Sequence, residues 1–447
     1  MNYNEALQCL FSKGTFGHKL GLQRIQKILD KMGNPQHSLK FIHIAGTNGK
    51  GSTSTMLSNI LIHSGYKTGL FISPYVVCFR ERMQINGQMI SEEEFANIAK
   101  YVYDCSNQID LNGESLTQFE TLTAISFEWY KRKNCDYVCL EVGMGGRFDP
   151  TNIIPKPILQ IITSISFDHT AILGDTIEKI AFEKAGIIKG GTTILYPLQE
   201  INATEVIKKK CEETGSKLVI PDVNKLSINK NSWQKDDFIY NGVKYHKSLK
   251  AEFQIYNCIT VIEAAKQLQK QNLLITDNDI KFSIENTYFP ARTEVLSKKP
   301  LIILDGSHNS GGIKALEQTL KSLPNRPITI IMGVLADKNY NDILNTVIKY
   351  ADNFIEVTPN NPRALKAEIL CQIAKNICEN SYSFDDLNSA LDFAISKTGD
   401  KGALVVCGSL YLASEIRPLI LSYVSNKPLS NSWQSKFIGI KLYSTQF

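Results

Sequence analysis

The sequence predicts an α/β protein made of two doubly wound domains, and three observations support this fold class. Residues 41–52 have the pattern of a short apolar strand, a glycine-rich turn and the start of a helix. Apolar strands then alternate with helical patterns as far as Val219, which is typical of a mostly parallel sheet covered on both faces. Beyond Pro290 the alternation begins again, with strands expected at 301–305, 328–333, 354–357 and 403–408.

The chain length also predicts more than one domain. A chain of 447 residues is too long for one ordinary hydrophobic core, and Pro290 punctuates the chain near its middle. We therefore expect a first domain over residues 1–293 and a smaller, Rossmann-like second domain over 298–425. Residues 426–447 are polar with no clear period, so we expect them to form an appendage.

Composition narrows the class of protein. The chain is 43% hydrophobic and 21% charged with a net charge of +5 and no block of like charges, so nucleic acid is not an expected partner. No apolar run approaches the length of a membrane span, and no signal peptide is evident at the start. Ten cysteines without a CxxC pair are typical of a reducing compartment. We expect a cytoplasmic protein without a membrane association.

The glycine-rich turn is the strongest functional signal. Gly46 and Gly49 allow a tight backbone turn that gathers N–H groups around one anion, and the following helix adds the partial positive charge of its N-terminus. Lys50 and the hydroxyl of Ser52 suit phosphate or Mg²⁺. The spacing departs from the usual G-x-x-x-x-G-K-[ST], because Gly51 stands where that pattern has serine or threonine. The alternative is an ordinary turn, but strand, helix and lysine together favour a P-loop for a nucleotide.

Polar side chains stand where four expected strands end: Lys50, Ser73, Glu141 and His169. Ligands of open parallel sheets bind at that edge. We expect Glu141 and His169 to follow neighbouring strands, where a carboxylate and an imidazole beside a triphosphate suit Mg²⁺. The alternative for His169 is a structural histidine held by Asp168. In the second domain, Asp305 and His308 follow the first strand in the same way.

Lys184 occupies an unusual position. We expect a helix capped by Asp175, on which Ile177, Ile180, Ala181 and Lys184 share one apolar face. A lysine buried in a core has a lowered pKa and reacts as a neutral amine. The alternative is a side chain that reaches back to solvent, and periodicity by itself favours that alternative.

Six segments resemble the folylpolyglutamate synthase/dihydrofolate synthase family of the Mur ligase superfamily, and they occur in the family's order. Two departures are visible: Phe289 and Ala291 stand where the family has tryptophan and glycine, and Phe253 stands where it has histidine. The segments are Ala45–Ser52, Leu140–Asp149, Ser166–Thr170, Glu183–Lys189, Phe289–Arg292 and Asp305–Asn309.

The resemblance implies ATP and two Mg²⁺ ions as cofactors, with Lys50, Lys184 and His169 in catalytic roles. Lys184 resembles the lysine that is carbamylated in this family. Metal ligands implied by the resemblance are Ser73, Glu141 and His169. Nucleotide contacts implied by it are Asn48, Gly49, Lys50, Gly51, Ser52, Asn257, Arg292, Asp305 and His308. The pterin-side residues that it implies are Thr117, Gln118, Phe119, Glu120, Phe148, Asp149 and Pro150, although core packing is an equally good interpretation of the two phenylalanines.

The implied activity is an ATP-dependent ligase that joins L-glutamate to dihydropteroate and to reduced folates through an acyl phosphate. Two alternatives stay open: a folylpolyglutamate synthase without the first activity, and a nucleotide-switched ATPase that drives a partner. A muramyl-peptide ligase is disfavoured, because the glycine-rich turn comes too early for a separate UDP-binding domain before it. We expect a monomer whose partners are small molecules.

Overall fold

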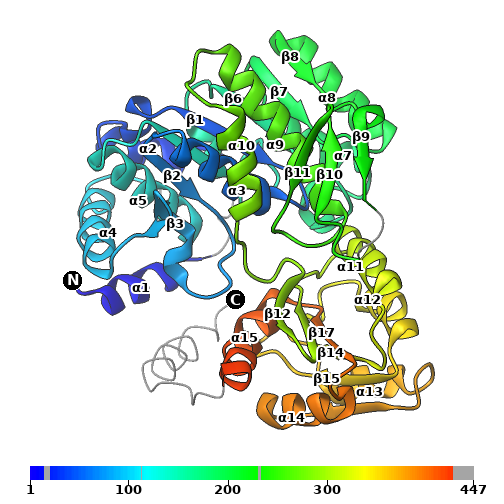
Figure 1. The fold of residues 1–447 in the computed structure, drawn as a ribbon. Helices are drawn as coiled ribbons and strands as arrows, with labels where there is room; N and C mark the ends of the chain where they lie inside the picture. Colours follow the sequence, from blue (N-terminus) through cyan, green and yellow to red (C-terminus); the bar gives the residue numbers. More distant parts are fainter. Residues whose placement is uncertain (15–20, 112, 230–232, 426–447) are drawn as a thin grey trace. The chain divides into compact units, whose positions relative to one another are not determined.

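The computed structural model describes residues 1–14, 21–111, 113–229 and 233–425, and the chain divides into two compact units (Figure 1). The first unit comprises residues 1–227, 238–248 and 254–288, and the second comprises 228–237, 249–253 and 289 onward. Both units are α/β structures, so the predicted fold class is confirmed. The expected appendage at 426–447 lies outside the described residues.

An eight-stranded sheet in the order β4-β3-β2-β5-β1-β6-β7-β8 organises the first unit. Neighbouring strands from β2 to β8 run parallel, whereas β3 and β4 join one edge in antiparallel fashion. The strands are β1 (Phe41–Ala45), β2 (Thr68–Phe71), β3 (Met83–Ile85), β4 (Gln88–Met89), β5 (Tyr137–Glu141), β6 (Leu159–Ile162), β7 (Gly191–Leu195) and β8 (Ser216–Val219).

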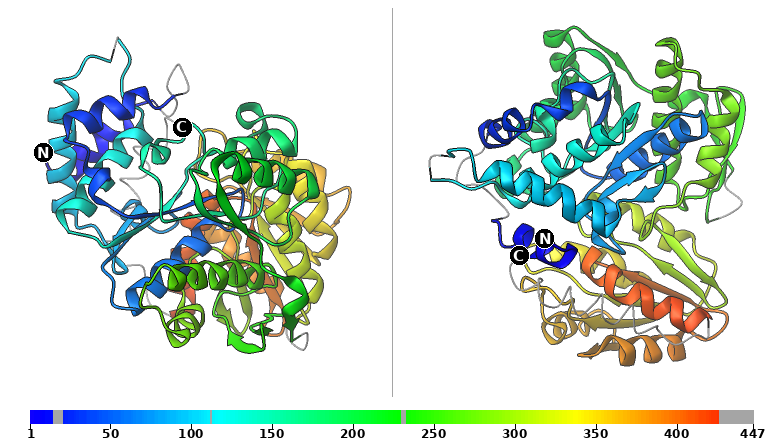
Figure 2. Two further views of the ribbon diagram at one scale, coloured as in Figure 1. Left: turned by 90° about the horizontal axis from the view of Figure 1, so that it is seen from above. Right: turned by 90° about the vertical axis from the view of Figure 1, so that its left-hand side faces the viewer.

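Helices cover both faces of this sheet (Figure 2). Helices α1, α2, α4 and α5 share a hydrophobic core with β1, β2 and β5, and α7 and α8 pack against β6 and β7. Helix α3 lies against β1, β2 and β5, and α10 lies against α3. The helices are α1 (Tyr3–Phe11), α2 (Gln23–Lys31), α3 (Lys50–His63), α4 (Glu92–Ser106), α5 (Gln118–Arg132), α6 (Thr170–Leu173), α7 (Ile177–Ala185), α8 (Ile201–Thr214), α9 (Phe253–Lys270) and α10 (Asp277–Asn286).

The central position of β1 corrects one expectation. Glu141 ends β5 and His169 follows β6, but these strands are not neighbours, because β1 lies between them and pairs with both. The chain first crosses outward to β2, returns to place β5 beside β1, and then crosses to the other side of β1. The glycine-rich turn after β1 is therefore flanked by the ends of β5 and β6.

The start of α7 corrects a second expectation. Thr176 caps this helix by accepting a hydrogen bond from the backbone N–H of Lys179. Asp175, the predicted cap, lies one residue too early and instead forms an ion pair with the side chain of Lys179 at 2.7 Å. Ile177, Ile180 and Lys184 of the same helix are buried, so the predicted apolar face is confirmed.

A small three-stranded sheet, ordered β11-β10-β9, precedes α9. Its hairpin turns at Asn241 and Gly242, whose φ angles are 50° and 76°; this left-handed pair is the conformation that an Asn-Gly turn favours. Strand β11 lies against α10. The strands are β9 (Leu226–Ile228), β10 (Asp237–Tyr240) and β11 (Val243–His246).

The second unit contains a six-stranded sheet in the order β12-β13-β17-β14-β15-β16, in which only β12 is antiparallel. Helices α11, α12 and α13 share its main core cluster. No helix in the described part of the chain is long and apolar enough to cross a membrane. The elements are β12 (Glu294–Lys298), β13 (Leu301–Leu304), α11 (Ser310–Ser322), β14 (Ile328–Met332), α12 (Tyr340–Val347), β15 (Asn353–Val357), α13 (Ala367–Ala374), β16 (Ser381–Phe384), α14 (Leu387–Thr398), β17 (Ala403–Cys407) and α15 (Leu410–Ser425).

Candidate active site

The glycine-rich turn joins β1 to α3 in a conformation that leaves the helix N-terminus open. Gly49 is left-handed, with φ of 87°, and no side chain caps α3. A Cβ on Gly49 would lie 2.6 Å from Oδ1 of Asn257, so only glycine fits there. In the first turns of α3, the buried hydroxyls of Thr53, Ser54 and Thr55 have no hydrogen-bond partner among the described residues. The open N–H groups at the start of α3 make this turn suitable for an anion.

The loop after β6 braces the glycine-rich turn. The backbone N–H of Thr47 donates to the carbonyl of Ser164 at 2.7 Å, and its hydroxyl donates to the carbonyl of Ser166 at 3.0 Å. The hydroxyl of Ser164 donates to the carbonyl of Asn48 at 3.2 Å, and the Asn48 amide donates to Ser166. These contacts were not predicted from the sequence. Thr47 and Ser166 lie in two of the segments named above, but no role was assigned to them there, and Ser164 was not singled out.

Lys50 and Glu141 lie together at this turn. The amine of Lys50 donates to the carbonyls of Gly46 at 3.1 Å and Thr47 at 3.3 Å, and it lies 4.0 Å from Oε1 of Glu141. Glu141 is 3% exposed, and its Oε2 accepts a hydrogen bond from the backbone N–H of Ser73 at 3.1 Å. Three of the four predicted polar strand ends are therefore brought into contact.

His169 takes a more exposed position. It is a left-handed residue, with φ of 49°, immediately before α6. Its side chain is 45% exposed and its Nε2 lies 3.8 Å from Oδ1 of Asp168. The backbone N–H of His169 donates to the same oxygen at 2.9 Å. Asp168 thus holds the turn that presents the imidazole, and the ring itself remains accessible to solvent.

The residue types at this edge fit Mg²⁺ rather than a metal bound by protein alone. Glu141 has carboxylate oxygens beside the glycine-rich turn, and Ser73 and His169 would add a hydroxyl and an imidazole. Among the described residues, no group of three or more His, Cys, Asp or Glu side chains gathers as a metal cluster. Mg²⁺ keeps several waters and takes phosphate oxygens as ligands, so one or two protein ligands at this position are sufficient.

Lys184 does not reach back to solvent. It is 3% exposed, and its amine donates to the carbonyl of Gly46 at 2.8 Å. Burial, and secondly the positive charge of Lys50, lower the pKa of Lys184 to about 7, while Asp168 and Asp149 oppose the shift. A large fraction of the amine is therefore neutral near pH 7, beside the glycine-rich turn.

Helix α9 places two buried polar residues against the same turn. The amide of Gln254 donates to the hydroxyl of Ser52 at 3.3 Å, and the amide of Asn257 donates to Gln254 at 2.9 Å. Asn257 also lies against Gly49, since a Cβ at that glycine would come within 2.6 Å of the Asn257 Oδ1. The predicted Asn257 is thus brought to the turn, together with Gln254, which sequence reasoning did not single out.

A buried network supports the glycine loop that follows β5. His43, in the middle of β1, is fully buried, and its Nε2 lies 2.9 Å from the hydroxyl of Thr151. That hydroxyl donates to Asp149 at 2.5 Å, and Asp149 also accepts from the backbone N–H of Met144 at 2.9 Å. Burial raises the pKa of Asp149 and lowers the pKa of His43 to about 3. His43 is consequently neutral, and because Thr151 donates to Asp149, its Nε2 carries the proton.

The predicted pterin-side residues make mainly internal contacts. Thr117 caps α5 in a reciprocal capping box with Glu120, which also pairs with Arg24 at 3.1 Å. Phe119 lies 5.8 Å from the ring of Phe71, and a Cβ on Gly143 would lie 2.6 Å from it. Pro150 begins the short helix 150–153, which Asp149 caps, and Gln118 is the first residue of α5.

Three predicted residues lie in the second unit. Both oxygens of Asp305 accept hydrogen bonds from the chain: Oδ2 from the backbone and hydroxyl of Thr293 at 2.8 and 2.9 Å, and Oδ1 from the backbone of Ser307 at 2.9 Å. Arg292 is half-buried, with its guanidinium 5.9 Å from the centre of the Phe289 ring. Nδ1 of His308 lies 2.9 Å from the carbonyl of Gly306.

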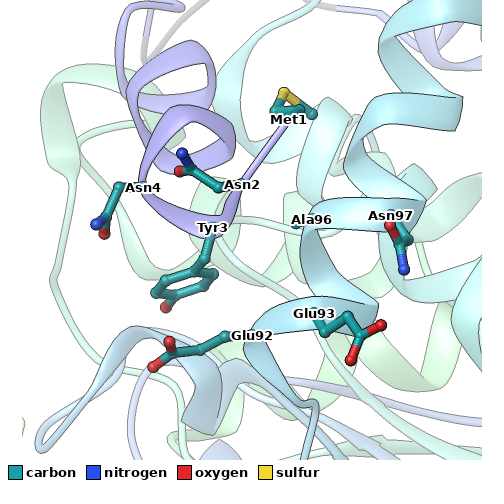
Figure 3. A pocket seen from close by; sticks show the side chains of 8 residues that line it. All are labelled: Met1, Asn2, Tyr3, Asn4, Glu92, Glu93, Ala96 and Asn97. Carbon is teal, nitrogen blue, oxygen red and sulfur yellow. The ribbon is translucent and has the colours of Figure 1, made fainter.

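A hollow of about 410 Å³ lies elsewhere in the first unit, between α1 and α4 (Figure 3). Its walls include Tyr3, Glu92, Glu93 and Asn97. None of the predicted site residues lines it. The candidate active site is therefore the edge around the glycine-rich turn and not this hollow.

Known proteins resemble this chain over most of its length. The sequence matches the Mur ligase middle domain over residues 44–265 and the Mur ligase glutamate ligase domain over 291–410. It is 33% identical over 428 residues to the dihydrofolate synthase/folylpolyglutamate synthase of Bacillus subtilis, covering 93% of this chain and 98% of that protein. The Escherichia coli protein of the same description is 31% identical, with coverages of 90% and 91%.

Solved structures give the same result. A folylpolyglutamate synthase of Mycobacterium tuberculosis complexed with ADP and AMPPCP superimposes with a TM-score of 0.84 at 26% identity, covering 94% of this chain and 98% of that chain. E. coli FolC in complex with DHPP and ADP gives a TM-score of 0.83 at 28% identity, covering 95% of this chain and 99% of that chain. The fold and the site define a Mur ligase, a class of ATP-dependent ligases. Within that class, the chain belongs to the dihydrofolate synthase/folylpolyglutamate synthase family.

Proposed function

We propose that this protein joins L-glutamate to dihydropteroate and to reduced folates, with or without glutamates already attached, at the expense of ATP. The observation that carries the proposal is the convergence of Lys50, Glu141 and Lys184 on one glycine-rich turn. The substrates are inferred from the names of the relatives, which include proteins described as dihydrofolate synthase/folylpolyglutamate synthase. Substrates are small molecules, and the protein is proposed to act as a cytoplasmic monomer.

The nucleotide phosphates are proposed to occupy the turn from Asn48 to Ser52. Lys50 supplies a full positive charge to the outer phosphates, and the open N-terminus of α3 supplies N–H donors. Asn257, which lies against Gly49, is proposed as the adenine contact. Further proposed contacts from the second unit are Arg292, Asp305 and His308.

Glu141, Ser73 and His169 are proposed to hold two Mg²⁺ ions together with phosphate oxygens. When bound, Mg²⁺ neutralises the triphosphate, so that an anionic carboxylate can approach it. Glu141 suits this role because its carboxylate is buried and faces Lys50. The backbone N–H of Ser73 fixes one oxygen of Glu141, which leaves the orientation of the carboxylate settled before any ligand arrives.

Lys184 is proposed to carry a carbamate. The neutral amine attacks CO₂, a C–N bond forms, and one amine proton is released to solvent. Burial favours the neutral amine, which is the reactive form. The carbamate nitrogen keeps one proton, which can still be donated to the carbonyl of Gly46. The product is an anion held at the edge of the phosphate turn, where a metal or a substrate amine can use it.

The reaction follows from charge and position. An oxygen of the substrate carboxylate attacks the γ-phosphorus, and the bond to ADP breaks, which gives an acyl phosphate. The neutral amine of glutamate then attacks the acyl carbon, the C–O bond to phosphate breaks, and the amine loses a proton. Lys50 stabilises the negative charge that develops on the phosphoryl oxygens. The protein contributes chiefly by positioning the reactants and by electrostatic stabilisation.

The acid substrate is proposed to lie between the start of α5 and the loop after β5. Phe119 and Phe148 would contact the flat pterin ring. Because Glu120 and Asp149 already hold the helix start and the loop, we propose that they position Thr117, Gln118 and Pro150 more than they contact substrate directly.

ADP release measured against a panel of acids tests the proposal. We expect release to require L-glutamate together with dihydropteroate or tetrahydrofolate, and to be low with either partner alone. Release with tetrahydrofolate but not dihydropteroate would restrict the activity to polyglutamate synthesis. ATP hydrolysis that is indifferent to both substrates would contradict a ligase and support a nucleotide-switched ATPase.

A further inference from the structure

Arg147, in the glycine loop after β5, has a fixed and accessible guanidinium that the proposed mechanism does not use. The guanidinium lies 4.2 Å from the centre of the Phe148 ring and 5.2 Å from that of Phe182. Its side chain is 42% exposed, and its Nε lies 3.5 Å from Oε1 of Glu183. Phe182 is itself exposed. The guanidinium is therefore held by two rings while part of it stays open to solvent.

The backbone of Arg147 is fixed as firmly as its side chain. Its N–H donates to the carbonyl of Glu183 at 2.8 Å, and a Cβ on Gly186 would collide with its Cα and Cβ. The guanidinium nevertheless donates no hydrogen bond to any of the described residues beyond its long ion pair with Glu183. Its N–H donors are thus preorganised and available, the condition in which arginine recognises carboxylates.

The position of Arg147 relates it to the proposed reaction. It contacts Glu183, whose neighbour in the chain, Lys184, points inward to the carbonyl of Gly46 at the phosphate turn. Leu173 of α6, the helix that follows His169, lies 3.0 Å from a Cβ built on Gly145 of the same loop. Arg147 therefore lies beside the C-terminal part of α7, next to the residue that precedes Lys184.

We propose that Arg147 binds the α-carboxylates along the glutamate tail of the folate substrate. The proposal rests on the proposed function and adds to it the site that distinguishes glutamylated substrates. In tetrahydrofolate the γ-carboxylate reacts and one α-carboxylate is left over. Each added γ-linked glutamate contributes a further α-carboxylate, whereas dihydropteroate has none. A cation at the rim of the site would therefore strengthen the binding of glutamylated folates and leave the binding of dihydropteroate unchanged.

The test is the KM of the Arg147→Gln variant for three acids: dihydropteroate, tetrahydrofolate and its triglutamate. We expect an unchanged KM for dihydropteroate and a KM for the triglutamate that rises about tenfold, the effect of losing one charge-assisted hydrogen bond at a partly exposed site. Tetrahydrofolate should show a smaller increase, and kcat should stay within about twofold for all three. Arg147→Lys keeps the positive charge without the planar, forked guanidinium. Its KM for the triglutamate should lie between those of the wild type and Arg147→Gln.

Arg132→Gln is the matched control. Arg132 also stacks on a ring, Tyr101 at 5.0 Å, and also pairs with a carboxylate, Glu128 at 2.7 Å, but it lies at the far end of α5. We expect it to change no KM. An equal loss of activity of Arg147→Gln with all three acids, or no loss with any, overturns the proposal. Wild-type protein without folate-dependent ADP release would instead overturn the proposed function itself.

Discussion

In both units a helix follows the first parallel strand of the sheet, but the N-termini of the two helices are capped differently. In the first unit, α3 begins after Gly49 without a capping side chain. In the second unit, α11 follows β13, and Asn309 caps it by accepting from the backbone N–H of Gly312 at 2.8 Å. The carboxylate beside that second loop, Asp305, already holds Thr293 and Ser307.

The difference separates a helix N-terminus that is open to an anion from one that a side chain closes. A helix N-terminus attracts anions only while its N–H groups are not satisfied by a side chain. The first unit leaves them open and adds Lys50, whereas the second closes its helix with its own residues. Position at the carboxyl end of a strand is therefore a weaker indicator of function than the hydrogen bonds that the polar group has already made.

Removal of the charged groups at the first turn should give the largest effect. We expect Lys50→Ala and Glu141→Ala each to lower kcat by about a thousandfold, the scale of losing one preorganised electrostatic contact. Melting temperatures should change little, because Lys50 contacts loop carbonyls and Glu141, and Glu141 stands at the end of its strand rather than among apolar core side chains. ADP release and thermal unfolding together check this, and near-normal activity of Glu141→Ala at saturating Mg²⁺ would refute the metal assignment.

Lys184→Ala should be the next largest effect. The loss of the proposed carbamate should make turnover undetectable or nearly so, and short carboxylic acids added to the assay should restore part of it by occupying the vacated position. Lys179→Ala on the same helix, which removes an exposed lysine paired with Asp175, is the control and should retain full activity. A mass spectrum of the active native enzyme that shows no carbamylated lysine, or a variant that no acid rescues, would contradict the proposed modification.

Asp305→Ala in the second unit should lower stability, whereas the substitutions at the first turn should lower activity. Its removal leaves the buried N–H groups of Thr293 and Ser307 without their acceptor, which costs about 2 kcal/mol. Urea unfolding should show a lower midpoint for the second unit. An unchanged midpoint would show that the hydrogen bonds of Asp305 do not hold this part of the second unit, and the contrast between the two units would fail.

The smallest expected effect is a change in how stability depends on pH, and it comes from Glu356. This carboxyl on β15 is fully buried, and neither oxygen has a hydrogen-bond partner within the described part of the chain. Burial raises its pKa to about 8, which the nearby Cys371 and Lys375 partly oppose. Between about pH 4.5 and 8 the folded state keeps a proton that the unfolded state loses, so stability falls as pH rises through this window. Glu356→Gln should abolish that part of the decline. Parallel pH profiles of the unfolding midpoint for both proteins would contradict it.

The sequence was most informative where a regular pattern and a motif coincide. Alternating strands and helices predicted both sheets, and the glycine-rich turn located the site. Edge strands β12 and β16 were not predicted, because short, half-polar edge segments such as Ser381–Phe384 lack the long apolar run of a central parallel strand.

Contacts between distant segments could not be predicted in the same way. The braces from Ser164 and Ser166 and the network from His43 through Thr151 to Asp149 join residues far apart in the chain, and single hydroxyls leave no periodic signal. Periodicity placed Lys184 on an apolar face but favoured a solvent-reaching side chain. The Lys184 amine can stay buried because it donates to the carbonyl of Gly46. Gly46 is distant in sequence, and only the fold places it beside Lys184.

Oxygen-18 transfer tests the central claim most directly. The enzyme is given tetrahydrofolate whose γ-carboxylate is labelled with ¹⁸O, together with ATP and L-glutamate, and the inorganic phosphate is analysed by mass spectrometry. An acyl phosphate requires the attacking carboxylate oxygen to leave with phosphate, so the account predicts one ¹⁸O in each phosphate formed. Phosphate that carries no label from the carboxylate, and takes its new oxygen from water instead, would contradict the ligase mechanism.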